Sequence, residues 1–231
     1  MKYIEPAATE IQEAILRNRD NHHRNETYTG LSDFRLLVAH RYNQFLSKKG
    51  RLDVAFGTSL PIGKTEEDPI KAGEAGEKHL HIQFGTGTFD PLLELHYTTA
   101  LSKKISLAAF TMNKVSIYKN SESYQGPFET TTGISVGHRP ANWFSLRGTI
   151  ASFTQTQATW DGESDPNSGL LSINGTLSPT FFLNNGFTIT PGYRFPLYQK
   201  TLSDEGDVFE YGPTFVLNVS RSFKANKNKA N

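Results

Sequence analysis

The chain has 231 residues, with 24 Lys and Arg against 23 Asp and Glu, and it contains no cysteine. The near-neutral charge gives no basic surface for nucleic acid, and the lack of cysteine excludes disulfides, thiolate metal sites and cysteine nucleophiles. Mean hydropathy is −0.48, and no apolar run approaches the ~20 residues that a membrane-spanning helix requires. A helical membrane protein is therefore excluded, and the even composition favours a single domain.

Alternating apolar and polar residues recur along nearly the whole chain, between clusters of Gly, Pro, Asn, Asp and Lys. This pattern predicts a meander of antiparallel strands. The first segment, 8–17, also fits a helical stripe, and we interpret it as a strand because it brings the count to about ten. The other predicted strands are 32–43, 52–60, 79–101, 104–116, 128–137, 142–156, 171–181, 187–197 and 210–223.

The face opposite the apolar series is made mostly of Gly, Ser, Thr, Asn and Ala, as in residues 128–137 and 171–181. The exposed face of a soluble barrel would be rich in Lys and Glu, whereas small polar residues suit a narrow polar lumen. The sequence therefore predicts an all-β fold, a single antiparallel up-and-down transmembrane β-barrel of about ten strands, or twelve if the chain is truncated upstream. A soluble, lipocalin-like ligand-binding barrel is the alternative.

Connector lengths support this interpretation, because outer-membrane barrels alternate short periplasmic turns with longer external loops. Short connectors are expected at 43–50, 102–103, 139–141 and 184–186, and long ones at 18–31, 62–78, 115–126, 157–168 and 199–209. The alternation holds if 79–101 is one strand interrupted by a β-bulge between Gly85 and Pro91.

Both termini bear on targeting. The first residues lack the basic and apolar regions of a secretory signal. Either a signal was removed, or the sequence is truncated upstream, or the membrane interpretation is wrong. The last strand ends at Phe223 and resembles the terminal strand of outer-membrane barrels, which implies recognition of Phe223 by the barrel-assembly machinery. We expect residues 1–223 to form the barrel and the polar tail, 224–231, to be disordered.

Three short glycine-rich motifs also resemble a narrower family. They are Thr-Gly-Leu-Ser-Asp-Phe-Arg at 29–35, Gly-Thr-Ser-Leu-Pro-Ile-Gly at 57–63 and Phe-Gly-Thr-Gly-Thr-Phe-Asp-Pro at 84–91. They are similar to motifs of the outer-membrane transporter-like proteins named for the meta-pathway of phenol degradation. The resemblance implies a porin-like transporter in the cell outer membrane of a Gram-negative envelope, which passes small, apolar or aromatic solutes.

Counting in twos along the strands assigns one group of charged residues to the lumen. These lumen-lining residues are Arg35, Arg41, Asp53, Glu94, His96, Glu129, Arg147 and Arg194. Charges in so narrow a barrel either line a thin aqueous path or pair with one another. We favour pairing, because the two signs are nearly balanced and unpaired buried charge is costly.

The sequence carries no recognised catalytic motif, so we expect no enzyme and no cofactor. His79, His81 and His96 with Glu94 come closest to a metal site, but polar residues at an external rim are the simpler interpretation, and no metal is predicted. The expected partners are outer-membrane lipid, the barrel-assembly machinery and a small-molecule solute, with no nucleic acid. An outer-membrane enzyme and a structural or binding barrel without transport remain alternatives.

Overall fold

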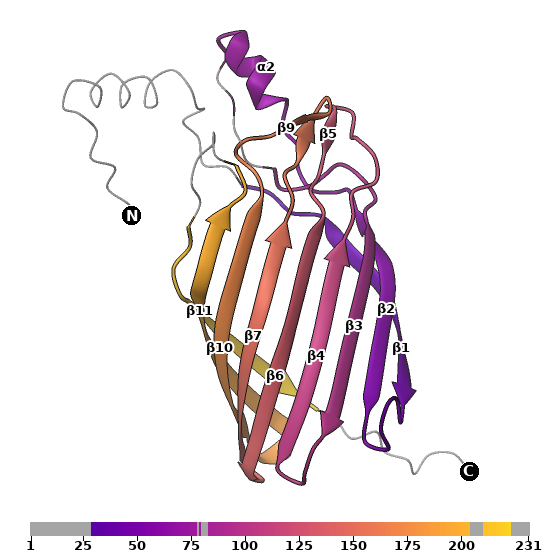
Figure 1. The fold of residues 1–231 in the computed structure, drawn as a ribbon, viewed down its shortest axis with the longest axis vertical. Coiled ribbons are helices and arrows are strands. Elements are labelled where there is room, and N and C mark those ends of the chain that lie inside the picture. The colour runs from indigo at the N-terminus through magenta and orange to yellow at the C-terminus, as the bar shows by residue number, and fades with distance from the viewer. Residues whose placement is uncertain (1–28, 78, 80–82, 204–209, 223–231) are drawn as a thin grey trace, which may run out of the picture.

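Nine long strands form one continuous antiparallel sheet in the computed structural model, which describes residues 29–77, 79, 83–203 and 210–222. Each strand pairs with its neighbour along the chain, and the sheet curls round into a barrel wall (Figure 1). The strands are β1 (Phe34–Asn43), β2 (Arg51–Leu60), β3 (Pro91–Ala100), β4 (Ile105–Lys114), β6 (Glu129–Ala141), β7 (Phe144–Gln155), β10 (Leu170–Phe182), β11 (Phe187–Thr201) and β12 (Thr214–Arg221).

The two ends of the wall differ in their connections. One end, here called the turn end, carries the short turns after β1, β3, β6 and β10, and the last of these contains the 3-10 helix η1 (Asn184–Gly186). The other, the loop end, carries the long connections, helix α2 (Pro69–Glu74) and a small sheet of β5 (Tyr124–Gln125), β8 (Thr159–Trp160) and β9 (Glu163–Ser164). Within the described part of the chain no helix is long and apolar enough to cross a membrane.

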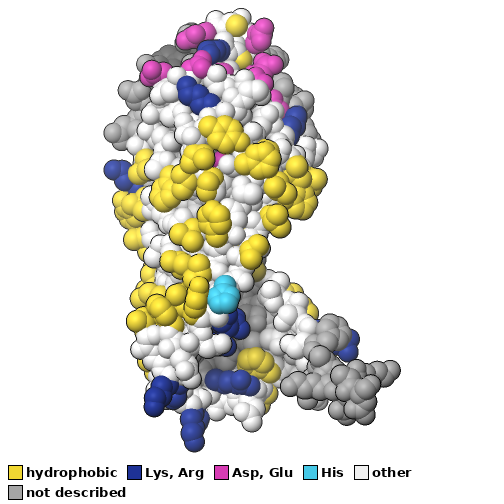
Figure 2. Space-filling view, turned by 90° about the vertical axis from the view of Figure 1, so that its right-hand side faces the viewer, with side chains coloured by type: hydrophobic (Ala, Val, Ile, Leu, Met, Phe, Trp, Pro, Cys, Tyr) yellow, Lys and Arg dark blue, Asp and Glu magenta, His cyan; other side chains and the backbone are white. Residues whose placement is uncertain are grey.

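Large apolar side chains cover the outer face of the wall instead of filling a core. Val38, Phe56 and Phe215 are 79%, 64% and 82% exposed. Figure 2 shows such side chains over the middle of the wall, with acidic side chains gathered near one end and basic side chains near the other. A soluble protein rarely exposes so much contiguous apolar surface.

The inner face is small and polar, as the sequence predicted. Ser135 on β6 lies opposite Thr149 on β7, and their hydroxyls are 2.8 Å apart. On β10, Ser172 and Asn174 are buried on the inner side of the sheet, whereas Leu177 is exposed on the outer side. Alternation of two residue classes along each strand thus produces two chemically different faces.

Two register shifts interrupt the strand pairing, one between His138 and Ala141 near the β6–β7 turn and one between β10 and β11. Between β10 and β11 the pairing passes from Ile173 opposite Tyr198 to Asn174 opposite Pro196, which leaves Leu197 unpaired in a β-bulge. Because of the bulge, Tyr198 lies on the outer face with its strand partner Ile173. Without the bulge, strict alternation would place Tyr198 and the preceding Leu197 on opposite faces.

Three expectations from the sequence need correction or lie outside the structure. The predicted interrupted strand 79–101 is wrong, because the wall contains only β3 from Pro91 onward, and residues 83–90 form a loop. The turn predicted at 139–141 lies at 142–143, since β6 continues to Ala141. The predicted strand 8–17, residue Phe223 and the tail 224–231 lie outside the described residues.

The described strands alone do not close the wall. Among the described strands, β1 and β12 each pair on one side only, and both run from the loop end to the turn end. Two parallel edges cannot pair with each other in an antiparallel barrel, so an additional strand of opposite direction is needed for closure.

Candidate functional site

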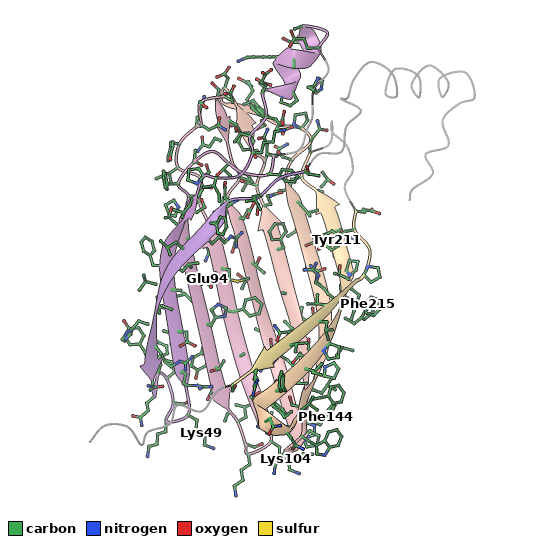
Figure 3. The ribbon with its side chains drawn as sticks, turned by 180° about the vertical axis from the view of Figure 1, so that it is seen from behind. Lys49, Glu94, Lys104, Phe144, Tyr211 and Phe215 are labelled. Carbon is green, nitrogen blue, oxygen red and sulfur yellow. The ribbon has the colours of Figure 1, made fainter. Side chains whose placement is uncertain are left out.

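The lumen-lining residues predicted from the sequence lie on the inner face, in four separate places. Strand register puts Arg41 opposite Asp53 and Asp53 opposite His96, while Arg35 lies opposite the buried Ser59. The other four are Glu94 on β3, Glu129 on β6, Arg147 on β7 and Arg194 on β11. Figure 3 shows Glu94 on the concave side of the sheet. The structure therefore brings only some of these charges together.

Arg41, Asp53, Glu94 and His96 form the first group, across three adjacent strands. Arg41 Nε donates to Asp53 Oδ1 at 2.6 Å and Arg41 Nη2 donates to Asp53 Oδ2 at 3.0 Å. This two-bond geometry is the strong form of an arginine–carboxylate pair. His96 Nε2 lies 3.5 Å from Glu94 Oε2, and its ring stacks on Phe110 with centroids 6.0 Å apart. Within this group the charges of Arg41 and Asp53 offset each other.

The second group contains Arg35 and Glu129, which line the same cavity near the loop end, of about 270 Å³. The partner of Glu129 is Lys114, at 2.9 Å, and Gln155 Nε2 donates to the same carboxylate at 3.1 Å. Lys114 was missed in the sequence because strand 104–116 was not assigned a parity. Lys114 has the same strand parity as Ala108, which is buried. Alternation along strand 104–116 could therefore have placed Lys114 on the inner face.

Residues 83–90, here called the mouth segment, fold over the loop end of this cavity and supply Gln83, Phe84, Gly85 and Thr86 to its lining. Thr88 and Asp90 are fully buried. The carboxylate of Asp90 accepts hydrogen bonds from the hydroxyls of Thr86, at 2.8 Å, and Thr88, at 2.6 Å. The mouth segment is thus held by side chains, which explains why it leaves the sheet.

The mouth segment is also tied to three neighbouring parts of the chain. Asp33, before β1, accepts hydrogen bonds from the backbone N–H groups of Gly63 and Thr86 at 2.8 and 2.9 Å. Ser59, at the end of β2, donates its N–H to the Asp90 carbonyl at 2.9 Å. Asn120, in the loop after β4, donates to the Thr86 carbonyl at 3.0 Å. These bonds satisfy polar groups that would otherwise be costly to bury.

The glycines of the mouth segment are required by its close packing. Gly87 has a φ of +71°, in the region where side chains are strained, and a Cβ there would lie 2.9 Å from Asn120 Cβ. A Cβ on Gly85 would meet the Asp33 carboxylate and would lie 2.7 Å from Gly63 Cα. The Gly-Thr-Gly-Thr motif therefore encodes a tightly packed loop and not a bulge in a strand.

Large apolar side chains on the inner face were missed in the sequence, among them Phe110 and Met112 on β4 and Phe153 on β7. Register places Phe110 opposite Gly133, and a Cβ on Gly133 would come within 2.6 Å of that ring. Phe153 lies opposite Thr131 and Ser172, both on the inner face. Strand parity was the available signal, but apart from its charged residues the inner face was expected to be mostly small and polar. The lumen therefore contains aromatic surface.

Arg147 and Arg194 contradict the expectation that the lumen charges pair. Among the described residues neither guanidinium has an ion-pair partner, and the strand partners of Arg147 are Gly137 and Ser178. The acidic side chains counted against them lie elsewhere, since Asp53 pairs with Arg41 and Glu129 with Lys114. Only two inner-face pairs of opposite full charge form in the part of the chain that the structure describes.

Arg194 lines a second cavity, of about 390 Å³, with walls from β6, β7, β10, β11 and β12. Phe153 and Asn174 line it too, and so does Tyr211, whose hydroxyl lies 2.8 Å from Ser172 Oγ and 3.1 Å from Asn174 Oδ1. This cavity joins a cationic group, an aromatic ring and neutral polar groups on one inner surface.

His79 and His96, the two described histidines of the candidate metal site, lie in different parts of the structure. His79 is buried beside helix α2, where its Nδ1 lies 3.1 Å from the Glu77 carbonyl oxygen, whereas His96 lies on the inner face of β3. His81 lies outside the described residues. No group of three or more metal-ligating side chains occurs within the described ranges.

The loop end and the turn end carry opposite charges. The turns at 44–50, 101–104, 142–143 and 183–186 contain four lysines and no acidic residue, and Lys49 and Lys104 mark this end in Figure 3.

At the loop end an ion pair joins Lys71 of α2 to Asp161. This pairing raises the pKa of Lys71 and lowers that of Asp161, while burial raises the pKa of Tyr124 in β5.

Comparison with known proteins gives a likeness among solved structures. No family model matches the chain, and no curated protein matches it. Among solved structures it is similar to an outer-membrane channel from Pseudomonas putida F1, with a TM-score of 0.58 and 12% sequence identity over 83% of this chain. The chain spans 65% of the length of that channel. The predicted fold class, an all-β antiparallel up-and-down barrel of the outer-membrane type, is confirmed.

Proposed function

We propose that this chain is an outer-membrane barrel that lets small, weakly polar solutes, aromatic ones among them, cross its lumen. The observation that carries the proposal is the composition of the inner face, where Phe110, Met112 and Phe153 lie among Gly, Ser and Thr residues. A surface of this mixed kind suits solutes with an apolar body and few polar groups. The exposed apolar outer face supports a lipid environment.

The proposal includes a narrow passage. The mouth segment and the Lys114–Glu129 pair line the same cavity near the loop end, so both restrict the lumen there. Hydrated ions are obstructed by such constrictions, and a small ion current is therefore expected. The motifs at 29–35, 57–63 and 84–91, two of which supply bonds of the mouth segment, also favour the family of the phenol-degradation meta-pathway.

The proposed location is the outer membrane of a Gram-negative cell, with lipid and the barrel-assembly machinery as partners. Removal of residues 224–231 should leave insertion by that machinery intact, whereas removal of Phe223 as well should impair it. Equal insertion of both truncations would contradict the proposed role of Phe223.

The test of transport uses vesicles with an encapsulated glucosidase and 4-nitrophenyl glucoside outside, so that release of nitrophenol reports solute passage. The unmodified chain should accelerate the release relative to protein-free vesicles. Ala151→Trp, on the inner face, should slow passage several-fold, because the indole fills the lumen, while Ile150→Trp on the outer face should not. The strand partners of Ala151 and Ile150 are Gly133 and Ile134, which share their respective faces.

No acceleration over protein-free vesicles would contradict transport and favour a structural or binding role. Equal effects of the two tryptophan substitutions would show that passage does not follow the inner face. A large, stable ion conductance of the unmodified chain in planar bilayers would overturn the narrow passage and favour an open pore.

A further inference from the structure

We infer that the cavity beside Arg194, here called the Arg194 cavity, is a binding site for a small aromatic carboxylate. The inference rests on the proposed function, because it names a class of solute that the lumen would take up. Four kinds of observation support it: the state of the Arg194 guanidinium, the aromatic ring beside it, the neutral polar wall and the distribution of charge along the barrel.

The Arg194 guanidinium has no ion pair with any described residue. Its partners across the sheet are Thr176 on β10 and Thr214 on β12, whose hydroxyls cannot neutralise a charge. A guanidinium offers five N–H donors in a planar fork that matches a carboxylate with two parallel hydrogen bonds. An anion with that geometry is the ligand that this side chain favours.

The aromatic part of the ligand is argued from Phe153. Phe153 and Leu170 line the same cavity as Arg194 and give it an apolar side. Rings in such positions bind other rings in offset or edge-to-face contact. At about 390 Å³ the cavity is within the range of sites for small ligands. A carboxylate at Arg194 with its ring towards Phe153 would therefore use both sides of the cavity.

The remaining wall is polar but uncharged, and it is held in place by its own hydrogen bonds. Asn174 Nδ2 donates to Ser172 Oγ at 3.2 Å, and the Tyr211 hydroxyl lies within hydrogen-bonding distance of both side chains. Among the described residues no Asp or Glu lines the cavity. An anionic ligand would therefore meet no like charge there, and the wall would not have to rearrange to receive it.

The other charged groups of the inner face do not offer an equivalent site. Arg41 already binds the Asp53 carboxylate through two hydrogen bonds, and Lys114 is paired with Glu129. Arg35 and Arg147 also have no ion pair with a described residue. The carboxylates of Asp33 and Glu129 line the cavity of Arg35 and would repel an anion. Arg147 lies near the turn end beside Lys103, Lys104 and Arg139, in a cavity without a Phe, Tyr or Trp side chain among its described lining residues. The structure thus separates an aromatic-acid site at Arg194 from a basic rim at the turn end, towards which an anion would be drawn.

The test is binding of 4-fluorobenzoate to the full chain in detergent micelles at pH 7, measured by fluorine NMR with benzoate as competitor and protein-free micelles as blank. Arg194→Gln should weaken binding by about tenfold, since it removes charge-assisted hydrogen bonds. Arg194→Lys should weaken it less, because it keeps the charge and loses the fork. Arg147→Gln, the matched lumen control, should leave it unchanged.

Two further measurements separate the parts of the inference. Uncharged 4-fluorobenzyl alcohol should bind more weakly than 4-fluorobenzoate and should not respond to Arg194→Gln, whereas Phe153→Leu should weaken both ligands. Unchanged 4-fluorobenzoate binding in Arg194→Gln, or equal losses in Arg147→Gln, would overturn the site. Binding that depends on Arg194, without solute passage in the vesicle assay, would uphold the site and refute transport. Solute passage without binding that depends on Arg194 would uphold transport and refute the site.

Discussion

The barrel wall and the mouth segment are built on different principles. In the wall, backbone pairing satisfies the polar groups and side chains alternate between two faces, so Ile134 is 59% exposed outside while its neighbour Ser135 is buried inside. In the mouth segment, side-chain oxygens take over that role, and Asp33 and Asp90 accept the hydrogen bonds that fix the loop. The wall is therefore periodic, and the mouth segment depends on individual residues.

This difference shows where sequence changes should matter. A change in the wall should act through the face on which it lies, whatever the strand. A change in the mouth segment should act through the specific hydrogen bonds that it removes. The predictions below separate the two cases.

The largest effect is expected on the outer face of the wall, at β10. Leu177→Arg should lower the free energy of unfolding by ~2–4 kcal/mol in lipid, because a guanidinium near the middle of the bilayer is costly. Ser178→Arg, one residue along on the inner face, should lower it less and should alter conductance instead. Unfolding by denaturant in phospholipid vesicles measures both. Equal losses at the two positions would contradict the assignment of faces.

A smaller effect is expected in the mouth segment. Asp90→Ala should lower the free energy of unfolding by about 2 kcal/mol, because the buried hydroxyls of Thr86 and Thr88 lose their acceptor. Asp90→Asn keeps one acceptor oxygen and should cost less. Thermal unfolding in detergent gives the comparison. If Asp90→Ala were as stable as the unmodified chain, the hydrogen bonds described here would not hold the segment.

The contrast also explains how much could be predicted from the sequence. Period-two alternation marked eight of the nine wall strands closely and placed Leu177 and Ser178 on opposite faces, because every strand obeys the same geometric rule. The mouth segment was predicted as a strand interruption, because Leu80, Ile82 and Phe84 also alternate. The decisive contacts, from Asp33 to Thr86 and from Ser59 to Asp90, join residues far apart in the sequence, which no local pattern reveals.

The lumen charges show a second limit of the sequence. Parity assigned Arg41 and Asp53 to the same face, but it could not show which charges lie opposite each other. The pairing of Glu129 with Lys114, and the lack of a described ion-pair partner for Arg147, depend on strand register. Register is set by the pairing of whole strands and by the turns that join them.

The smallest effect is expected at the loop end, where Lys71 joins α2 to Asp161. The lowered pKa of Asp161 means that the contribution of this ion pair to stability is present above the ordinary carboxyl range. It is lost as the pH falls through the folded-state pKa. The raised pKa of Lys71 means that it is lost again as the pH rises above the ordinary lysine range. The protection factors of the α2 amides in hydrogen exchange, which are corrected for the intrinsic pH dependence of exchange, should therefore be largest between these limits, and Lys71→Met should remove that dependence. An unchanged pH profile in Lys71→Met would contradict the tether.

The central claim, that one face of the wall meets lipid and the other an aqueous lumen, is tested most directly by spin labels at Ile150→Cys and Ala151→Cys. The chain has no other cysteine, so each label is unique. In phospholipid vesicles the label at 150 should collide mainly with oxygen, which partitions into lipid, and the label at 151 mainly with a water-soluble nickel complex. Equal accessibility of the two labels to both reagents would contradict the barrel's placement in a membrane.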